Sequence, residues 1–248
     1  MVKAVFETTL KLLLSPLLLW QGLRVRKHAL ILPEPTGPRF GVDGSGPPLS
    51  LLVLGDSSAA GVGVPTQEMA LTGQLLRELA PFFTVTWDLT ARTGATTATT
   101  LERLKRLDPR DYDAVVLAVG VNDVTRSVPL NRWISAHGKL FDLLHSKFKA
   151  KRIYTSDLPP MGQFPALPQP LRGIIGMTAR RYDAAMARYQ ATRPEITRLQ
   201  LDLPMDPALM AKDGFHPGAT VYAKWAQALA THIREDFGTA GNAQETGG

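Results

Sequence analysis

The sequence of 248 residues contains no cysteine, which excludes disulfide bonds, a thiolate nucleophile and cysteine-ligated zinc. The redox state of the compartment therefore stays open. The sequence also lacks internal repeats and any apolar run of the roughly 20 residues that a membrane-spanning helix needs. What remains is an ordinary globular composition, with 44% hydrophobic and 20% charged residues. A chain of this length can bury a full apolar core.

The net charge of +6 is concentrated near the N-terminus. Residues 1–30 hold five lysines and arginines, with Glu7 as the only acid, so most of the positive excess lies there. The other cations are dispersed. Arg180, Arg181 and Arg188 fit the solvated face of a helix better than a phosphate-binding track. We therefore expect no nucleic-acid partner.

Residues 1–30 form an apolar and basic arm. Its leucine-rich part is interrupted by Lys11 and Pro16 and is too short and broken to span a membrane. No small-residue cleavage site of a secretory signal follows it. Two interpretations stay open: the arm lies on a membrane surface with its cations at anionic head groups, or it packs on the following domain or on a second copy of the chain. We expect a cytoplasmic protein, associated with the membrane surface in the first case.

The rest of the chain has the layout of an α/β domain. Proline and glycine dominate residues 31–48, which predicts an extended linker. A domain over 49–237 and a flexible tail over 238–248 are expected to follow. Short apolar runs alternate there with longer amphipathic ones, a pattern typical of a parallel sheet with helices on its faces. The expected strands are 51–54, 85–89, 114–119, 153–155 and 196–203, and the expected helices fall within 69–79, 101–107, 133–148, 179–189 and 222–233.

Three short motifs carry polar groups next to these strands. Gly55-Asp56-Ser57 follows the first strand, Gly120-Val121-Asn122-Asp123 follows the third, and Asp213-Gly214-Phe215-His216 lies between the last strand and the last helix. The carboxyl ends of parallel strands form one crevice in an open α/β sheet. The three motifs are therefore expected to meet at one edge.

Each motif also has an ordinary interpretation on its own. The first is a strand-to-helix turn in many proteins. It lacks both the lysine of a nucleotide phosphate loop and the Gly-x-Ser-x-Gly elbow of the α/β-hydrolases. Asn122 is a common turn residue, and Asp213 is a common helix cap beside a surface histidine. However, His216 is the only histidine expected in a loop apart from His28 of the arm, and its spacing from Asp213 lets one compact loop join carboxylate and ring.

Taken together, the motifs supply the parts of a serine hydrolase. A serine hydroxyl becomes a nucleophile when a histidine removes its proton and an acid orients that histidine. Ser57, His216 and Asp213 are the candidates for these roles. The candidate oxyanion donors are the Ser57 and Gly94 backbone N–H groups and the Asn122 side-chain amide.

The combined pattern resembles the SGNH hydrolase superfamily, also called GDSL-type esterases and lipases, over roughly residues 49–237. The family's serine, glycine, asparagine and histidine blocks are matched by Ser57, Gly94, Asn122 and His216. Ser58 stands where the family often has leucine and is a rival nucleophile. The resemblance implies a flavodoxin-like three-layer α/β/α sandwich around a mostly parallel five-stranded sheet. It also implies a shallow open site without metal or other cofactor, and ester hydrolysis through an acyl-enzyme.

The expected substrate is a small-molecule ester with a short to medium acyl chain. The proline-rich stretch 156–170 is expected to wall the acyl side with Met161, Phe164 and Leu167, next to Phe215; a rigid surface spacer carries equal weight. A lysophospholipase, a thioesterase or an acyltransferase would use the same triad. A carbohydrate deacetylase and a non-catalytic binding protein rank lower.

Overall fold

A six-stranded sheet forms the centre of the computed structural model, which describes residues 9, 13–201 and 206–238. The strands lie in the order β1-β3-β2-β4-β5-β6. All neighbours are parallel except β1, which pairs antiparallel with β3 at the edge. This confirms the predicted α/β class with a mostly parallel sheet. The strands are β1 Phe40–Asp43, β2 Pro48–Gly55, β3 Thr84–Ala91, β4 Ala114–Ala118, β5 Arg152–Ser156 and β6 Ile196–Leu199.

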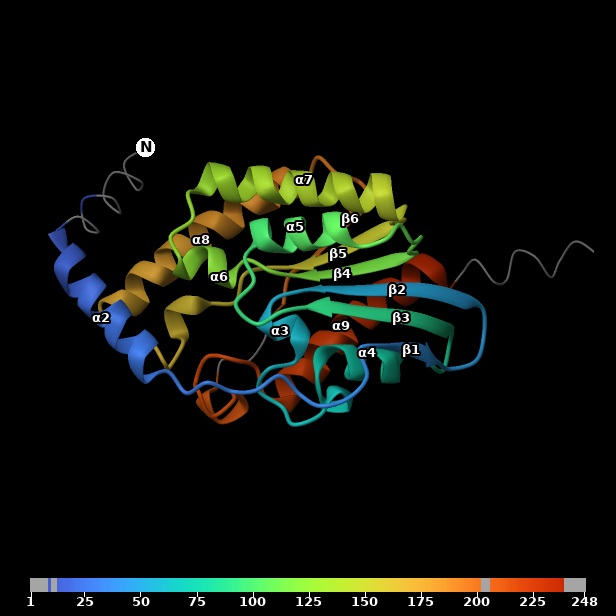
Figure 1. The fold of residues 1–248 in the computed structure, drawn as a ribbon, viewed down its shortest axis with the longest axis horizontal. Coiled ribbons are helices and arrows are strands. Elements are labelled where there is room, and N and C mark those ends of the chain that lie inside the picture. Colours follow the sequence, from blue (N-terminus) through green and yellow to red (C-terminus); the bar gives the residue numbers. More distant parts are fainter. Residues whose placement is uncertain (1–8, 10–12, 202–205, 239–248) are drawn as a thin grey trace, which may run out of the picture.

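Helices cover both faces of the sheet, as the three-layer sandwich requires (Figure 1). Helices α4 and α9 pack on one face, and α5, α7 and α8 pack on the other. Leu51 and Val53 of β2 belong to the first core, whereas Leu52 and Leu54 belong to the second. A strand buried on both faces is apolar throughout, which explains this run. The helices are α2 Ser15–His28, α3 Ser57–Ala60, α4 Leu71–Leu79, α5 Thr97–Arg106, α6 Val121–Thr125, α7 Leu130–Phe148, α8 Leu171–Gln190 and α9 Ala219–Phe237, with short 3₁₀ helices η1 Gln67–Met69, η2 Met161–Gln163 and η3 Pro207–Leu209.

The sheet has one strand more than the five predicted, and this strand lies in the segment predicted as a linker. Strand β1 is anchored by its pairing with β3 and by the Trp87 indole, which donates to the Asp43 carboxylate at 2.7 Å. Its two apolar side chains, Phe40 and Val42, are exposed. An edge strand that buries no apolar side chain gives no core signal. The proline and glycine content of residues 31–48 therefore predicts a linker, although Phe40–Asp43 extends the sheet.

Two other boundaries differ from the prediction. Helix α8 begins at Leu171 rather than near residue 179, because Gly173 and Gly176 lower the helix propensity of its first half. Gly176 is needed there, since a Cβ atom would lie 2.6 Å from the Gly162 Cα of η2. The last strand ends at Leu199. Residues 202–205, and the predicted tail beyond Gly238, lie outside the described residues.

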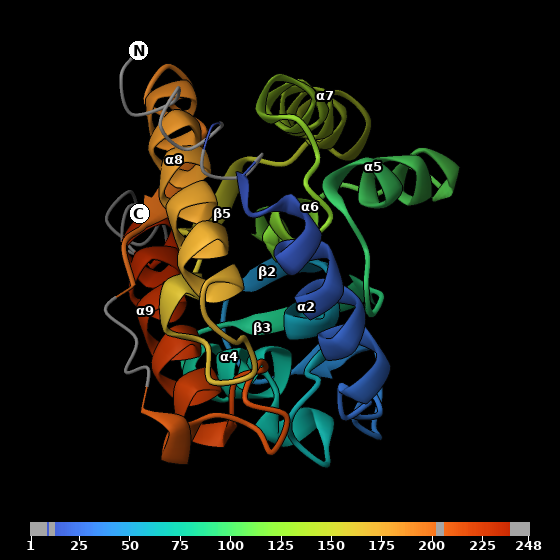
Figure 2. The same cartoon turned by 90° about the vertical axis from the view of Figure 1, so that its left-hand side faces the viewer.

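The loops that follow the parallel strands lie on one side of the molecule. Ser57 begins α3 directly after β2, Gly94 follows β3, and α6 follows β4. The arrows of the parallel strands in Figure 1 point to this side, where α3 and α6 lie. Helix α2 lies on the same side and packs against α8 (Figures 1 and 2).

Candidate active site

The side chains of Ser57, His216 and Asp213 form a continuous hydrogen-bonded chain. The Ser57 Oγ atom lies 2.9 Å from His216 Nε2. On the other side of the ring, His216 Nδ1 lies 2.5 Å from Asp213 Oδ2. Residues that are 159 positions apart in sequence are therefore in contact. With the three groups arranged in this way, the histidine ring can take the proton of the serine hydroxyl, and the carboxylate keeps the ring in the orientation that this requires.

Ser57 is held at the first position of a short helix. The Asp56 carboxylate caps α3 by accepting from the Ser58 backbone N–H at 2.9 Å and from the Ser58 hydroxyl at 2.8 Å. Ser58 therefore points its hydroxyl at Asp56, whereas Ser57 points its hydroxyl at His216. Beyond the helix, Gly63 has φ +116°, and a Cβ atom there would lie 2.3 Å from the Pro217 carbonyl oxygen. This close approach lets the Ser57 and His216 loops meet.

Asp56 is a buried carboxyl group beneath the nucleophile, and sequence reasoning assigned it no role. Burial raises the pKa of Asp56 to about 6, against the lowering effect of its hydrogen bonds from Ser58. The Asn122 amide nitrogen lies 3.4 Å from Asp56 Oδ2. Asp56 thus lies between the helix that carries the nucleophile and the residue expected to bind the oxyanion.

His216 is oriented by hydrogen bonds inside its own loop, residues 213–216. Asp213 Oδ1 accepts from the backbone N–H groups of Phe215 and His216, both at 3.0 Å. Partial burial raises the pKa of Asp213, but the hydrogen bonds from His216 and from these two amides outweigh it and hold the pKa below its ordinary value. The carboxylate is therefore ionised and fixed, as a partner for an imidazolium must be.

Two of the predicted oxyanion donors lie in neighbouring loops, since the Asn122 amide bonds Ala95, the residue after Gly94. Gly94 has φ +75°, a left-handed conformation that glycine adopts without strain. No hydrogen bond within the described residues uses the Ser57 or Gly94 backbone N–H. The Asn122 amide donates to the Ala95 carbonyl at 3.0 Å, while its contact with Asp56 is long. Two free backbone donors and one weakly engaged amide N–H are the type of group that stabilises an oxyanion.

Helix α6 fastens the Gly94 loop through two further side chains that sequence reasoning missed. The buried Asp123 carboxylate accepts from the Thr97 backbone N–H at 2.9 Å and from its hydroxyl at 3.0 Å. Arg126 donates to the Gly94 carbonyl at 2.8 Å. The sequence indicates a role for Asp123 only through its place directly after Asn122. The roles of Asp123 and Arg126 cannot be read from spacing, because their partners Thr97 and Gly94 lie in a different part of the chain.

An apolar pocket with a volume of about 110 Å³ opens beside Ser57 and His216. The proline-rich stretch after β5 forms much of its wall, through Leu158, Pro159, Pro160 and Phe164. The rings of Phe164 and Phe215 meet edge to face there, with 5.0 Å between centroids. Its apolar lining includes Leu117, Val119, Leu158, Pro159, Pro160, Phe164, Phe215 and Trp225.

Two of the predicted substrate-binding residues lie elsewhere. Met161 is 0% exposed and packs in the core beneath α8, so it does not line the pocket, and the expectation for this residue is wrong. Its position in η2 turns the side chain inward. Leu167 borders a separate groove between α2 and the active site. Within the described residues, no group of three or more histidine and acidic side chains could hold a metal ion.

The comparison with protein families matches residues 53–224 to the GDSL-like lipase/acylhydrolase family. No curated relative matches the sequence. Solved structures share the fold. The psychrotrophic esterase EstA from Pseudoalteromonas sp. has a TM-score of 0.58 at 18% identity, covering 76% of this chain and 98% of EstA.

Two further structures are similar over the same share of the chain. Est24, a carbohydrate acetylesterase from Sinorhizobium meliloti, has a TM-score of 0.53 at 19% identity and covers 76% of this chain and 100% of its own. A lipase/acylhydrolase from Enterococcus faecalis has a TM-score of 0.51 at 17% identity and covers 76% of this chain and 96% of its own.

Proposed function

Because this chain belongs to the GDSL-like lipase/acylhydrolase family and is an ester-hydrolysing enzyme, we propose that it is a serine esterase that cleaves esters of short to medium acyl chains through an acyl-enzyme. The observation that carries this proposal is the contact of 2.9 Å between Ser57 Oγ and His216 Nε2. Asp213 completes the arrangement on the far side of the ring. A hydroxyl with such a base is an activated nucleophile.

The reaction follows from these positions. His216 takes the Ser57 proton as Oγ attacks the ester carbonyl, and the Asp213 carboxylate stabilises the imidazolium that forms. The carbonyl oxygen becomes an anion that accepts from the Ser57 and Gly94 N–H groups and the Asn122 amide. His216 then returns the proton to the leaving alcohol. Water repeats the attack on the acyl-enzyme, and Ser57 regains its proton.

The size of the apolar pocket supports an upper limit on the length of the acyl chain. Its volume of about 110 Å³ and its apolar walls favour an acyl group at the short end of the range. A panel of p-nitrophenyl esters from acetate to palmitate measures this directly. We expect kcat/KM to be highest for the shortest chains, and an optimum at palmitate would contradict this assignment of the pocket.

The nucleophile is tested with Ser57→Ala and the matched control Ser58→Ala. We expect Ser57→Ala to lower kcat for p-nitrophenyl acetate by about 10⁴-fold or more, because the nucleophile is lost. Ser58→Ala keeps the backbone N–H that bonds Asp56 and should retain most of the activity. The reverse pattern would identify Ser58 as the nucleophile. Product analysis with added glycerol separates hydrolysis from acyl transfer.

Helix α2 supports a location at a lipid surface. It is joined to the domain by Gln21, whose amide nitrogen donates to the Gln169 carbonyl at 2.6 Å and whose oxygen accepts from the Leu171 N–H at 3.1 Å. Leu19, Trp20 and Leu23 are 66%, 54% and 56% exposed. These three side chains therefore do not pack on their own domain. None of the helices in the described ranges is long and apolar enough to cross a bilayer.

We propose that this exposed face of α2 lies on a membrane with anionic head groups. The last two turns of the helix carry Arg24, Arg26 and Lys27, whose charge complements such a surface, while the leucines and Trp20 enter the interface. The groove between α2 and the active site is lined by Asn122 and His216. A membrane under α2 would therefore lie close to the entrance of the active site. A cytoplasmic location stays a prediction.

A double variant, Leu19→Ser with Leu23→Ser, tests this proposal better than removal of residues 1–30, which would also remove Gln21. We expect it to lose co-sedimentation with phosphatidylglycerol vesicles while its oligomeric state stays unchanged. Phe40→Ser, at an exposed apolar residue of β1, is the control and should still bind. Unchanged vesicle binding with loss of a dimer would show instead that α2 contacts a second copy.

A further inference from the structure

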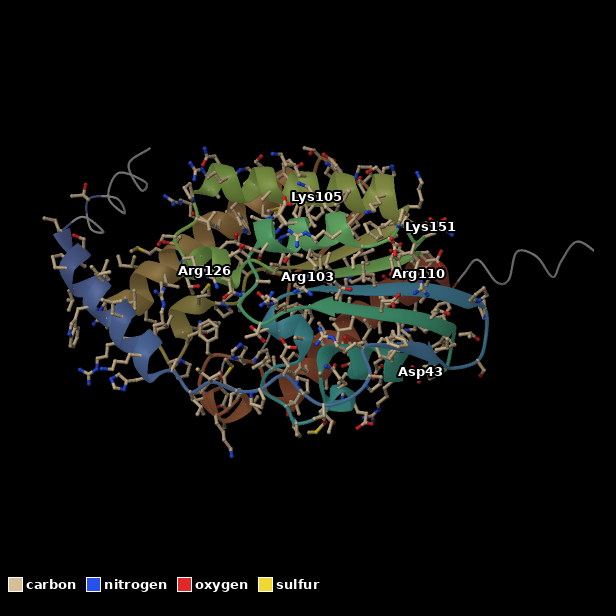
Figure 3. The ribbon with its side chains drawn as sticks, in the orientation of Figure 1. Asp43, Arg103, Lys105, Arg110, Arg126 and Lys151 are labelled. Carbon is tan, nitrogen blue, oxygen red and sulfur yellow. The ribbon has the colours of Figure 1, made fainter. Side chains whose placement is uncertain are left out.

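A second groove, distinct from the apolar pocket, begins at the oxyanion donor Gly94. It runs from the loop after β3 along the exposed face of α5. Four arginines line it together with a single acid, Glu102. Arg103 and Arg126 are labelled in Figure 3, beside α5 and α6. The arginines of the groove are Arg92, Arg103, Arg106 and Arg126.

The protein neutralises the positive charge of this groove only in part, through electrostatic interactions of Glu102 with Arg106 and of Asp123 with Arg126. In the described part of the chain, none of the four arginines forms an ion pair with a carboxylate. Glu102 is already bound by Lys105 at 2.7 Å. Glu34, which binds Thr93 of the adjoining loop, is paired with Arg39 at 2.9 Å. Four guanidinium groups that share one groove with a single acid keep a positive excess and repel one another, and an anion relieves that repulsion.

The groove is physically joined to the reacting centre. The Arg126 guanidinium donates to the Gly94 carbonyl, and Gly94 offers its free N–H to the oxyanion. Arg126 also borders the groove that contains Asn122 and His216. An ester held by these donors therefore has apolar walls on one side and arginines on the other.

The chemistry of the two sides orients the substrate. A charged group in the apolar pocket would lose its hydration without gaining a partner, so the uncharged acyl chain belongs there. The alcohol portion then extends past Gly94 toward the arginines. A phosphate carries close to two negative charges at neutral pH and accepts from several guanidinium groups at once, which suits four arginines better than a single carboxylate does.

We propose that this groove binds a phosphate group on the alcohol portion of the ester, so that the natural substrate is an acyl ester of a phosphorylated alcohol. This inference rests on the proposed function and adds the substrate class. The phosphate belongs either to a soluble ester or to a lipid whose head group is a phosphate monoester, since both present the same group to the arginines.

The test compares butyryl glycerol phosphate with butyryl glycerol, two esters that differ only in the phosphate. We expect wild-type kcat/KM to be about tenfold or more higher for the phosphorylated ester. The double variant Arg103→Gln with Arg106→Gln should lose most of this preference through KM and hydrolyse butyryl glycerol normally. Arg77→Gln, at an exposed arginine of α4, is the matched control and should keep the preference. If the double variant also loses activity on an acyl glycerol phosphate in vesicles, the phosphate that the groove binds is that of a lipid head group.

A binding measurement separates this inference from the proposed function. Calorimetry of the Ser57→Ala protein with glycerol phosphate should show binding that disappears in the Arg103→Gln, Arg106→Gln background. Such binding would support the groove even if no ester were hydrolysed. Equal kcat/KM for the two esters in the wild type, together with no binding of glycerol phosphate, would overturn the inference while leaving an esterase intact.

Discussion

His216 is positioned by its own loop, whereas the Gly94 loop is positioned by a helix from another part of the chain. The Asp213 carboxylate accepts hydrogen bonds from the His216 ring and from two backbone amides, and all of these groups lie within residues 213–216. The Gly94 loop instead depends on Asn122, Asp123 and Arg126 of the α6 region. A local arrangement needs only a tight turn, but a distant one needs the whole sheet to be in register.

This difference leads us to expect that changes in the histidine loop act on chemistry alone, while changes at the α6 contact act on both chemistry and stability.

The largest effect is expected for Asp213→Asn. The amide keeps an oxygen for the Phe215 and His216 N–H groups but no longer stabilises the imidazolium, so kcat for p-nitrophenyl acetate should fall by about 10⁴-fold. Urea unfolding should change little. A loss of less than tenfold would mean that Asp213 does not support the base.

A smaller effect is expected for Asn122→Ala on the distant side. Loss of one oxyanion donor should lower kcat by about 10²–10³-fold, with KM nearly unchanged. The variant also leaves the Ala95 carbonyl without its donor, so a modest loss of stability should accompany it. Unchanged kcat would remove Asn122 from the oxyanion site.

Asp56 lies between the two sides and should make stability depend on pH. Its pKa is about 6 in the folded protein against an ordinary value of 3.8, so between these values the folded state holds a proton that the unfolded state releases. This contribution is complete below pH 3.8 and is lost as the pH rises through 6, by up to about 3 kcal/mol.

Asp56→Asn does not titrate and provides the comparison. Urea unfolding of both proteins from pH 4 to pH 7 should show the wild type losing stability relative to the variant as the pH rises. Parallel pH profiles for the two proteins would contradict the raised pKa of Asp56.

The smallest effect is expected for Asp123→Ala, which tests the fastening of the Gly94 loop. It leaves the Thr97 N–H and hydroxyl without their acceptor and should destabilise the fold by about 2 kcal/mol. Because Asp123 acts through the loop, kcat should fall about tenfold without a change in KM. Asp123→Asn retains an oxygen acceptor and should recover part of the activity. Full activity in both variants would mean that the loop is held by other contacts.

The same comparison explains what the sequence could predict. The Asp213–His216 pair could be assigned because its geometry follows from a spacing of three within one turn. The parallel strands could be assigned because residues 51–54 of β2 and all of β4 are apolar. The roles of Asp123 and Arg126 could not, because their partners are fixed only when β3 and β4 take their places beside β2. Strand β1 has no such signal, since both of its own apolar side chains, Phe40 and Val42, are exposed.

The most direct test of the central claim, that His216 activates Ser57, is labelling with a fluorophosphonate followed by mass spectrometry of the modified peptide. The proposed mechanism predicts a single adduct on Ser57 Oγ in the wild type, formed much more slowly in Asp213→Asn. An adduct on Ser58, or no adduct in a preparation that still hydrolyses esters, would contradict it.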